Sequence, residues 1–511
     1  VVINGTIDLL GEAQLIQNHT GTTSNSGSGS LFKRQQGTAN LHNYNYWSSP
    51  VNRGGYWQIG NLEDATGVVN FTTNVDANPL TAPITLSSRW LYSFKGPAND
   101  YNAWSKLTPS SNISPGIGYS MKGSGAATSE QEFIFKGLPN DGDYTFPVAI
   151  NTEFLVGNPY PSTLDSFQFI LDNLLVIDGT LHFWESFTTN NSHYLADYEG
   201  GYATLTLLLS LPAVADLSGL TSGLGIPSKP LPTRYIGVGQ GFFVKTLLGG
   251  NLRFQNSQRA FARESLSETV YYKTNTKNKQ ATLEDNRPKL WFSFTSSKNY
   301  QKTIGLGYDN NTTYGYDRGY DAKPYDNLKD DVYWLQQDNE KLIIQGLPEI
   351  NTEDNLQLGI NVTNAGLYKF SISKMENIPD DLNIYLVDNN QNIYYDLRNG
   401  EAQLFLNTGN GQHQFSIVFK DENTLGTKTV EKQNMFTTYD TNTKILELHF
   451  KEPMADIENI KIYNTLGQEV MDMKLPNPNR INLSHLPDSV YILKLKSKTS
   501  NTLKSIKFVK Y

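Results

Sequence analysis

Four aspartates in a stretch rich in tyrosine and glycine are the side chains of this sequence best suited to holding a metal ion. They are Asp309, Asp317, Asp321 and Asp326. Calcium is bound by about six to eight oxygen ligands, often carboxylate oxygens, so this group is a candidate calcium site. The spacing of these aspartates differs from that of an EF-hand loop, and the stretch lacks the glutamate that binds calcium through both of its oxygens. We therefore expect hydrogen-bonded turns here, with calcium as the alternative, and no cofactor.

The other chemistry-bearing residues follow no catalytic pattern. The chain has no cysteine, which excludes disulfides, thiolate metal sites and cysteine nucleophiles. His182 and His193 form the one local histidine group and lack the His-Glu-x-x-His spacing of zinc hydrolases, so we expect His182 to be an exposed strand residue. A pair of carboxylates for glycoside hydrolysis stays possible, because the two members of such a pair need only lie close in space. The sequence thus predicts a protein that is not an enzyme.

Two Gly-x-Gly sequences resemble part of a nucleotide-binding loop. Gly116-Ile-Gly118 and Gly239-Gln-Gly241 both lack the third glycine and open no helix. Each instead comes directly before a predicted strand rich in aromatic residues. Each also follows a proline-containing turn, which is Tyr46-Trp-Ser-Ser-Pro50 for the first and Gly157-Asn-Pro-Tyr-Pro161 for the second. We interpret the two stretches as a tandem duplication of a β-unit, whose glycines allow close backbone approach.

The first of these two stretches is also rich in tryptophan. Trp47, Trp57, Trp90 and Trp104 all fall within it. Large aromatic rings contribute much of the packing energy of protein cores, so we expect these side chains to pack between sheets. A platform that binds sugars is the alternative.

The elements that position these residues are predicted to be strands. The chain of 511 residues contains 29 Tyr, 24 Phe and 41 Gly, a mixture that suits twisted sheets with many turns. No sustained helical periodicity is present, and the one short helix we expect covers residues 165–173. The predicted fold class is all-β, with several β-sandwich domains in tandem and a small antiparallel β-sandwich at the end.

Changes in composition divide the chain into segments, since polar stretches separate the groups of predicted strands. The segments are a β-rich module at 1–150, a second copy at 151–262, a β-sandwich at 288–420, a linker at 421–435 and a terminal module at 436–511.

Charge and hydropathy narrow the classes of partner. The net charge of −8 argues against nucleic acid. The longest apolar run, near residues 205–211, is too short for a transmembrane helix, so the chain is not expected to span a membrane. No signal peptide is visible, and Val1 begins abruptly in a predicted strand. We expect the sequence to be a mature or truncated part of a longer polypeptide.

The terminal module shows the clearest strand pattern. In residues 444–450, Leu446 and Leu448 alternate with polar residues, which is the period of a half-buried strand. Gly467 stands between two such strands and is expected at a positive φ. After Asp488 the module contains six lysines and no carboxylate. Lysines on terminal strands discourage edge-to-edge aggregation, and a role in recognition is the alternative.

Four stretches of this module resemble the type A sorting domain of the type IX (Por) secretion system of Bacteroidota. They are Ile460–Val470, Ile481–Pro487, Val490–Lys494 and Lys507–Lys510. The resemblance implies a folded β-sandwich signal that directs passage through the translocon barrel, is collected by an outer-membrane shuttle barrel and is usually cleaved by a surface sortase. It also implies an extracellular or cell-surface destination. Ser489 departs from the pattern, because the family usually has glycine there.

We expect six residues to matter most for sorting and for contact with these partners. For Leu486 and Tyr491, simple core packing is the alternative role. The six are Gly467, Leu486, Tyr491, Lys494, Lys507 and Lys510.

The region before the terminal module resembles a part that recurs in large exported surface proteins, including gliding-motility adhesins. The stretches that carry the resemblance are 46–50, 157–161, 239–243 and 317–322. The resemblance implies adhesive or structural β-domains on the cell surface. Two alternatives remain: an exported carbohydrate-binding or hydrolytic cargo, or the C-terminal tail of a longer surface effector.

Overall fold

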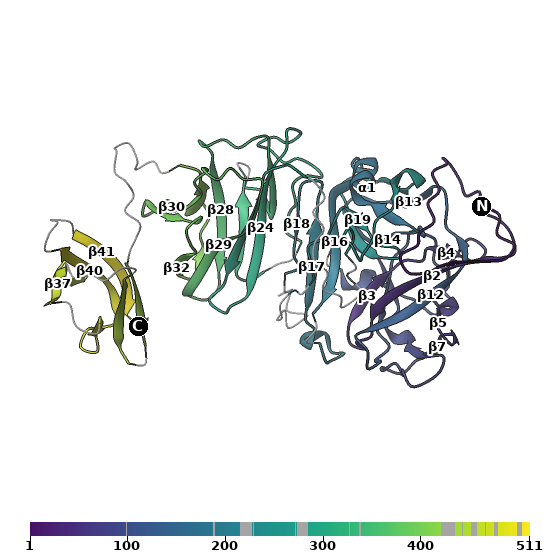
Figure 1. Cartoon of the computed structure of the whole chain (residues 1–511), viewed down its shortest axis with the longest axis horizontal. Coiled ribbons are helices and arrows are strands. Elements are labelled where there is room, and N and C mark those ends of the chain that lie inside the picture. Colours follow the sequence, from purple (N-terminus) through teal and green to yellow (C-terminus); the bar gives the residue numbers. More distant parts are fainter. Residues whose placement is uncertain are drawn as a thin grey trace. The chain divides into compact units, whose positions relative to one another are not determined.

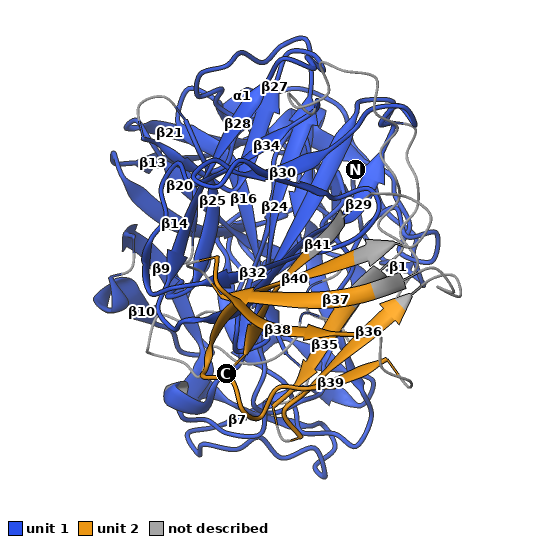
Figure 2. Ribbon diagram, turned by 90° about the vertical axis from the view of Figure 1, so that its left-hand side faces the viewer, with its two compact units in different colours: residues 1–421 blue, residues 422–511 orange. Residues whose placement is uncertain are grey.

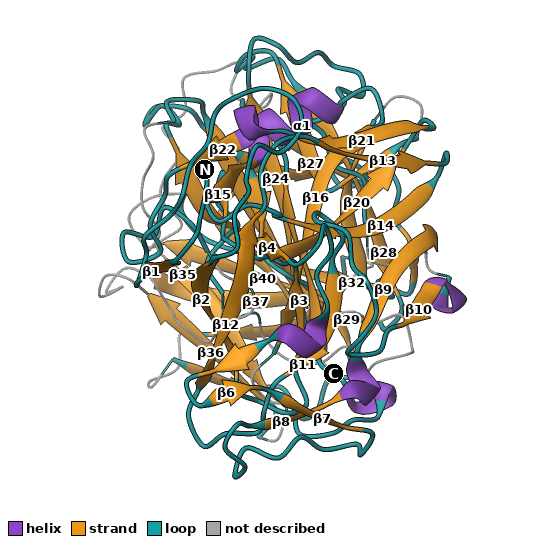
Figure 3. Cartoon of the chain, turned by 90° about the vertical axis from the view of Figure 1, so that its right-hand side faces the viewer, coloured by secondary structure: helices purple, strands orange, loops and turns teal. Residues whose placement is uncertain are grey.

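The computed structural model divides into two compact units, Val1–Asp421 and Glu422–Tyr511 (Figure 2). Strands dominate both units, as Figure 3 shows, and the predicted all-β class is confirmed. The described residues are 1–98, 100–187, 190–214, 227, 229–270, 272, 285–325, 328–336, 339–420, 435–441, 443–450, 457–464, 467–474, 479–497 and 503–510.

The first unit opens with two large sheets (Figure 1). The six-stranded sheet has the order β1 (Thr6–Leu9), β2 (Ser30–Thr38), β12 (Glu130–Pro139), β5 (Glu63–Asp64) and β6 (Gly67–Val68), with β4 (Val51–Asn52) paired to β12. The nine-stranded sheet has the order β18 (Ser210–Leu211), β17 (Gly200–Leu205), β16 (Ile177–Ser186), β20 (Gly241–Thr246), β14 (Thr152–Gly157), β9 (Tyr92–Pro97), β11 (Tyr119–Lys122) and β3 (Tyr44–Trp47), with β10 (Trp104–Lys106) paired to β9.

Smaller elements complete this part of the unit. Three small sheets are formed by β13 (Tyr144–Val148) with β21 (Gly250–Phe254), by β15 (Thr163–Asp165) with β19 (Tyr235–Ile236) and β22 (Arg259–Ala260), and by β7 (Asn70–Thr72) with β8 (Thr85–Ser87). Short 3₁₀ turns lie at Ile59–Asn61, Ser88–Trp90, Tyr101–Ala103, Leu195–Asp197 and Asn256–Gln258.

The nine-stranded sheet joins the first two predicted modules. Strand β9 lies in segment 1–150 and β14 in segment 151–262, and they pair antiparallel with Glu153 opposite Gly96. Their apolar cores remain distinct, since the buried members of one cluster run from Ile3 to Phe135 and those of the other from Val148 to Tyr272. The buried core residues thus change from one cluster to the other between Phe135 and Val148, before the predicted boundary at residue 150, while the nine-stranded sheet continues across it.

The two Gly-x-Gly strands, β11 and β20, each have a neighbour on both sides in the nine-stranded sheet. The amide of Ser48, in the first stretch, donates to the carbonyl of Gly239 in the second at 2.9 Å. Reciprocally, the amide of Gly157 donates to the carbonyl of Gly116 at 3.1 Å. Gly116 and Gly239 have φ values of +93° and +69°, which side chains rarely tolerate. Each stretch thus forms a backbone hydrogen bond to the Gly-x-Gly segment of the other stretch, and their origin by duplication stays a prediction.

The expected helix is present as α1 (Ser166–Asn173). The carboxylate of Asp165 caps it by accepting from the amide of Phe167 at 3.1 Å, which satisfies one of the unpaired donors of the first turn. Phe169 and Ile170 on its inner face are fully buried in the core of the second module. α1 is the single α-helix among the described residues.

Residues 288–420 form the predicted sandwich. Its five-stranded sheet has the order β27 (Ile344–Leu347), β24 (Gln301–Tyr308), β23 (Lys289–Thr295), β29 (Gly366–Glu376) and β32 (Ala402–Leu406). Its seven-stranded sheet has the order β26 (Lys341–Leu342), β25 (Asp331–Leu335), β28 (Asn355–Val362), β34 (Phe415–Val418), β30 (Tyr385–Asp388) and β31 (Ile393–Asp396), with β33 (Gly409–Asn410) paired to β28. Strand alternation directs Phe292, Trp334 and Ile417 into one core between the sheets.

This sandwich is packed firmly on the second module. Leu208, Leu209 and Leu211, at the edge of the nine-stranded sheet, are buried members of the sandwich core. The indole N–H of Trp291 donates to the carbonyl of Ser210 at 2.8 Å. The sandwich therefore shares its apolar core with the end of the preceding sheet.

The second unit is a small antiparallel sandwich, as predicted. One sheet contains β35 (Met435–Asp440), β36 (Ile445–Phe450) and β39 (Arg480–Asn482). The other contains β38 (Glu469–Met473), β37 (Ile457–Asn464), β40 (Ser489–Ser497) and β41 (Leu503–Lys510). Gly467 lies in the turn between β37 and β38 with φ +79°, which confirms the prediction. Of the predicted linker, residues 421–434 lie outside the described residues, and Met435 begins β35.

Candidate sorting module and candidate binding sites

The terminal sandwich is held together by the alternating apolar residues of its strands. Side chains from both sheets meet in one core, because successive residues of a strand point to opposite faces. Its buried members are Leu446, Leu448, Ile460, Ile462, Ile481, Leu483, Leu486, Tyr491, Leu493, Leu495 and Phe508. The module therefore has a core of its own.

Leu486 and Tyr491 belong to this core, as the alternative of core packing expected, and their importance for sorting stays a prediction. Tyr491 is 2% exposed and stacks on Phe508 with ring centres 5.7 Å apart. Its hydroxyl donates to the carbonyl of Pro487 at 2.8 Å and fixes the turn that enters β40. Ser489 lies within β40 opposite Lys510, so serine is accommodated where the resembling family has glycine.

The three predicted lysines have different surroundings. The ammonium of Lys510 pairs with Asp488 at 2.6 Å, and this hydrogen bond raises the pKa of Lys510 and lowers that of Asp488. The ammonium of Lys494 lies 5.1 Å from the centre of the Tyr463 ring. Lys507 is exposed. The Asp488–Lys510 pair was missed because it depends on the register of β40 with β41, which strand patterns do not give.

The aspartate-rich stretch forms the expected hydrogen-bonded turns. Asp321 is fully buried and accepts from the amides of Asp317 at 2.7 Å and Gly346 at 2.6 Å, while burial raises its pKa to about 7. Asp309 accepts from the guanidinium of Arg287 at 2.8 Å. Within the described ranges, no group of three or more histidine, aspartate or glutamate side chains is arranged to hold a metal ion. Asp326 lies outside those ranges.

The prediction that His182 is exposed is wrong. His182 is 2% exposed and stacks on Tyr325 with ring centres 3.9 Å apart. Its strand, β16, is flanked on both sides by β17 and β20, and burial lowers the pKa of His182 to about 3. The imidazole is therefore neutral. Tyr325 comes from the third module, a partner that the sequence around His182 does not indicate.

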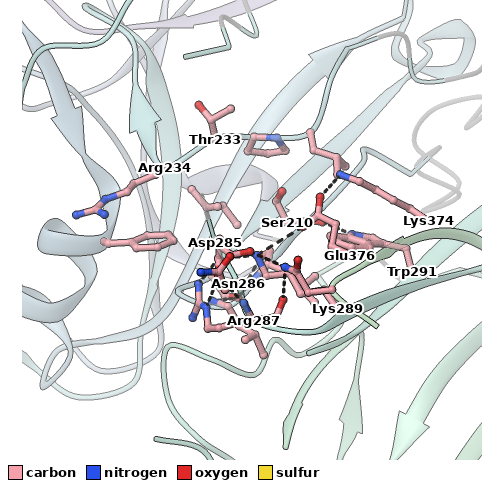
Figure 4. A pocket seen from close by; sticks show the side chains of 18 of the residues that line it. Ser210, Thr233, Arg234, Asp285, Asn286, Arg287, Lys289, Trp291, Lys374 and Glu376 are labelled. Atoms are coloured by element: carbon pink, nitrogen blue, oxygen red, sulfur yellow. Dashed lines mark hydrogen bonds and ion pairs between the residues drawn. The ribbon is translucent and has the colours of Figure 1, made fainter. Parts of the chain in front are cut away.

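A cavity of about 990 Å³ lies between the nine-stranded sheet and the sandwich (Figure 4). The charged residues that line the cavity form ion pairs with one another. Lys289 contacts Asp285 at 2.6 Å and Glu376 at 3.8 Å. Arg287 contacts Asp285 at 2.7 Å. Burial opposes ionisation of Asp285, but hydrogen bonds from Arg287 and Lys289 outweigh it and hold the pKa of Asp285 well below its usual value. Asp285 is therefore unsuited to act as a general acid at neutral pH.

A second cluster, centred on Lys122, was not predicted. Lys122 is 4% exposed, and its ammonium lies 4.1 Å from the centre of the Trp90 ring and 4.4 Å from that of Tyr44. It is 3.1 Å from Nδ1 of His193, whose Nε2 is 2.9 Å from a carboxylate oxygen of Asp76. Burial lowers the pKa of Lys122 to about 7. Tyr44 lies opposite Lys122 on β3, whereas Trp90 comes from a 3₁₀ turn and His193 from a loop farther along the chain.

We expect the first unit to become more stable as pH rises from 7 to 9, by roughly 1–2 kcal/mol attributable to Lys122. The unfolded lysine, with a pKa near 10.5, keeps its proton in this range, whereas the buried lysine loses it. The unfolded state therefore binds more protons, and the free energy of unfolding increases with pH. Urea unfolding at both pH values, followed by tryptophan fluorescence, measures the slope. Lys122→Met should flatten it; an unchanged slope in that variant contradicts the assignment.

Comparisons with known proteins divide the chain where the structure does. Residues 1–419 match a family described as Domain of unknown function (DUF8693), and residues 441–510 match one described as Secretion system C-terminal sorting domain (Por_Secre_tail). No curated protein and no solved structure gave a significant match. In the described part of the chain, no helix is long and apolar enough to cross a membrane. The chain belongs to the DUF8693 family and ends in a secretion system sorting domain that directs its export through the type IX system.

Proposed function

We propose that the first unit works at the cell surface as an adhesive or structural body, and that the terminal sandwich delivers it there. The observation that carries this proposal is the independence of the sorting module. It has its own core and forms a compact unit outside the family region that ends at residue 419. A signal built in this way can be gripped or removed without disturbing the core of the first unit.

The partners proposed for the terminal sandwich are the translocon barrel, the outer-membrane shuttle barrel and the surface sortase. Two strand edges of its four-stranded sheet, β38 and β41, are unpaired within the sheet and offer backbone groups for pairing. Lys507 adds an exposed cation on β41. We propose that edge pairing and positive charge together carry recognition, because complementary charge favours encounter and orientation.

The test is a reporter fused ahead of residues 421–511 and expressed in a cell with a working type IX system. We expect the reporter outside the outer membrane, as measured by protease accessibility on intact cells. The full chain lacking residues 421–511 should stay in the periplasm. A fusion that remains periplasmic in the competent cell rejects the sorting role of this module. Release of the fusion into the medium on loss of the sortase would support sortase-dependent attachment.

The alternative of a carbohydrate-binding cargo is favoured by one observation, the half-buried aromatic rings on the nine-stranded sheet. Tyr44, Trp104 and Tyr202 pack against a buried aromatic cluster and are themselves only partly buried. A surface body that binds sugars would also be adhesive, so this alternative refines the first proposal.

A further inference from the structure

The nine-stranded sheet has two aromatic faces with different surroundings. On β16 and β20, Phe183 and Phe242 point into the apolar core beneath α1. The next residues along these strands, Trp184 and Phe243, point to the opposite face, as strand alternation requires. On that face the register places Tyr202 opposite Trp184. Rings from neighbouring strands therefore form a second, separate cluster.

We call this cluster the aromatic row. Its rings follow one another across the sheet: Trp184 and Tyr202 are 5.0 Å apart, Tyr202 and Phe243 5.8 Å, Phe243 and Phe94 5.3 Å, and Phe94 and Trp104 5.1 Å between ring centres. Trp184, Phe243 and Phe94 are buried, at 8%, 2% and 4% exposed. The row thus extends over strands β17, β16, β20, β14, β9 and β10 as one packed layer, in which buried Leu155 of β14 lies between the rings of β20 and β9.

Aromatic rings also form the solvent-facing side of the row. Trp104 and Tyr202 are half-buried members of the cluster at its two ends. Tyr101, in the 3₁₀ turn immediately before Trp104, is 62% exposed. Tyr92 is half-buried and meets the edge of Trp104 at 6.5 Å. An exposed group of large rings is a common feature of interaction sites, because leaving such surface in water is unfavourable.

Polar atoms at the Trp104 end are available to a ligand. Among the described residues, the indole N–H of Trp104 and the hydroxyl of Tyr92 have no protein hydrogen-bond partner, and neither atom is buried. The ammonium groups of the two flanking lysines are already hydrogen-bonded to backbone carbonyls. That of Lys95 donates to Pro147 at 2.7 Å, and that of Lys106 donates to Ser88. The site therefore combines ring faces and uncharged donors with one exposed cation, Arg89, whose charge acts on Tyr92 and Lys106.

We infer that the Trp104 end of the aromatic row binds an uncharged polysaccharide. Sugar rings present C–H faces that pack on aromatic rings and hydroxyls that pair with an indole N–H or a phenol, so both features of the site are used. An acidic polymer carries a carboxylate on each repeating unit and would need several cations, whereas the two flanking lysines are already hydrogen-bonded and Arg89 is a single exposed cation. This inference rests on the proposed surface role of the first unit and names the class of ligand that it would hold.

The test is co-sedimentation of the purified full chain with insoluble cellulose and insoluble chitin, and affinity electrophoresis with soluble xylan and with alginate as the acidic polymer. We expect the chain to bind at least one uncharged polymer. Trp104→Ala should weaken that binding roughly three- to tenfold, because it removes one stacking ring and its N–H. Trp104→Phe keeps the ring and should lose less. Phe405→Ala, an exposed ring in the sandwich, serves as the matched control and should bind like the unmodified chain.

Polysaccharide binding tests this inference, and display on intact cells tests the proposed surface role, so the two can fail independently. Circular dichroism establishes whether Trp104→Ala is folded. If it is not, the binding of Trp104→Phe is compared with that of the unmodified chain instead. Binding to alginate alone, no binding to any uncharged polymer, or equal binding by unmodified chain and folded Trp104→Ala would overturn the inference. Because the binding assay uses purified protein, these results leave export untouched. Surface display of Trp104→Ala on intact cells should equal that of the unmodified chain.

Discussion

A chain carrying Tyr491→Asp is expected to remain in the periplasm, because its terminal sandwich should no longer fold. Tyr491 is buried against Phe508, and its hydroxyl holds the turn at Pro487. Losing a buried aromatic ring costs about 3–5 kcal/mol, and burying a carboxylate adds to that cost. Small domains are stable by only about 5–15 kcal/mol, and a sandwich of this size lies toward the low end of that range.

Two further variants separate folding from recognition. Tyr491→Phe removes only the hydroxyl bond, a loss of about 0.5–1.5 kcal/mol, so it should fold and be exported. Lys507→Ala changes an exposed side chain and should leave folding intact while testing the charge proposed for recognition. Circular dichroism of the isolated unit 422–511 and protease accessibility on intact cells give the two readouts. Export of Tyr491→Asp at the normal level would contradict the dependence of sorting on this fold.

Arg259→Met is expected to destabilise the first unit by about 3–5 kcal/mol, because it removes a buried cation from oxygen atoms that remain buried. Arg259 and Asp141 have fully buried side chains that approach to 3.5 Å, and the carboxylate of Asp141 also lies 2.7 Å from Nε2 of His19. The guanidinium also donates to Asn256 at 3.0 Å and to the carbonyl of Leu15, and it lies 4.8 Å from the centre of the Tyr160 ring. These contacts tie the N-terminal segment to the second module.

The matched control is Arg234→Met. Arg234 also forms an ion pair, with Asp165 at 2.7 Å, but its side chain is 43% exposed, so its loss should cost no more than about 1 kcal/mol. All seven tryptophans lie in the first unit, so fluorescence-detected urea unfolding of the full chain reports on that unit alone. Equal destabilisation by the two variants would contradict the central role assigned to the buried pair.

The local features of this protein followed from the sequence because they depend on residues near one another. Alternation of apolar and polar residues indicated the terminal strands, and Leu446 and Leu448 are buried as that period requires. Gly467 was predicted at a positive φ from its place between two strands. The helix from Ser166 follows a capping aspartate that the sequence shows directly. The order of motifs in the last 76 residues was sufficient to identify the sorting module.

Tertiary structure alone decided which distant residues meet, because strand pairing is set by total burial and register rather than by local pattern. The pairing of β9 with β14 joined two predicted modules into one sheet. Tyr325 covered His182, and loops far from β11 enclosed Lys122. Strand alternation told which rings share a face of the sheet, but only the packed fold showed that Trp104 keeps contact with solvent. The inferred binding site is therefore a product of long-range contacts that no single stretch of sequence contains.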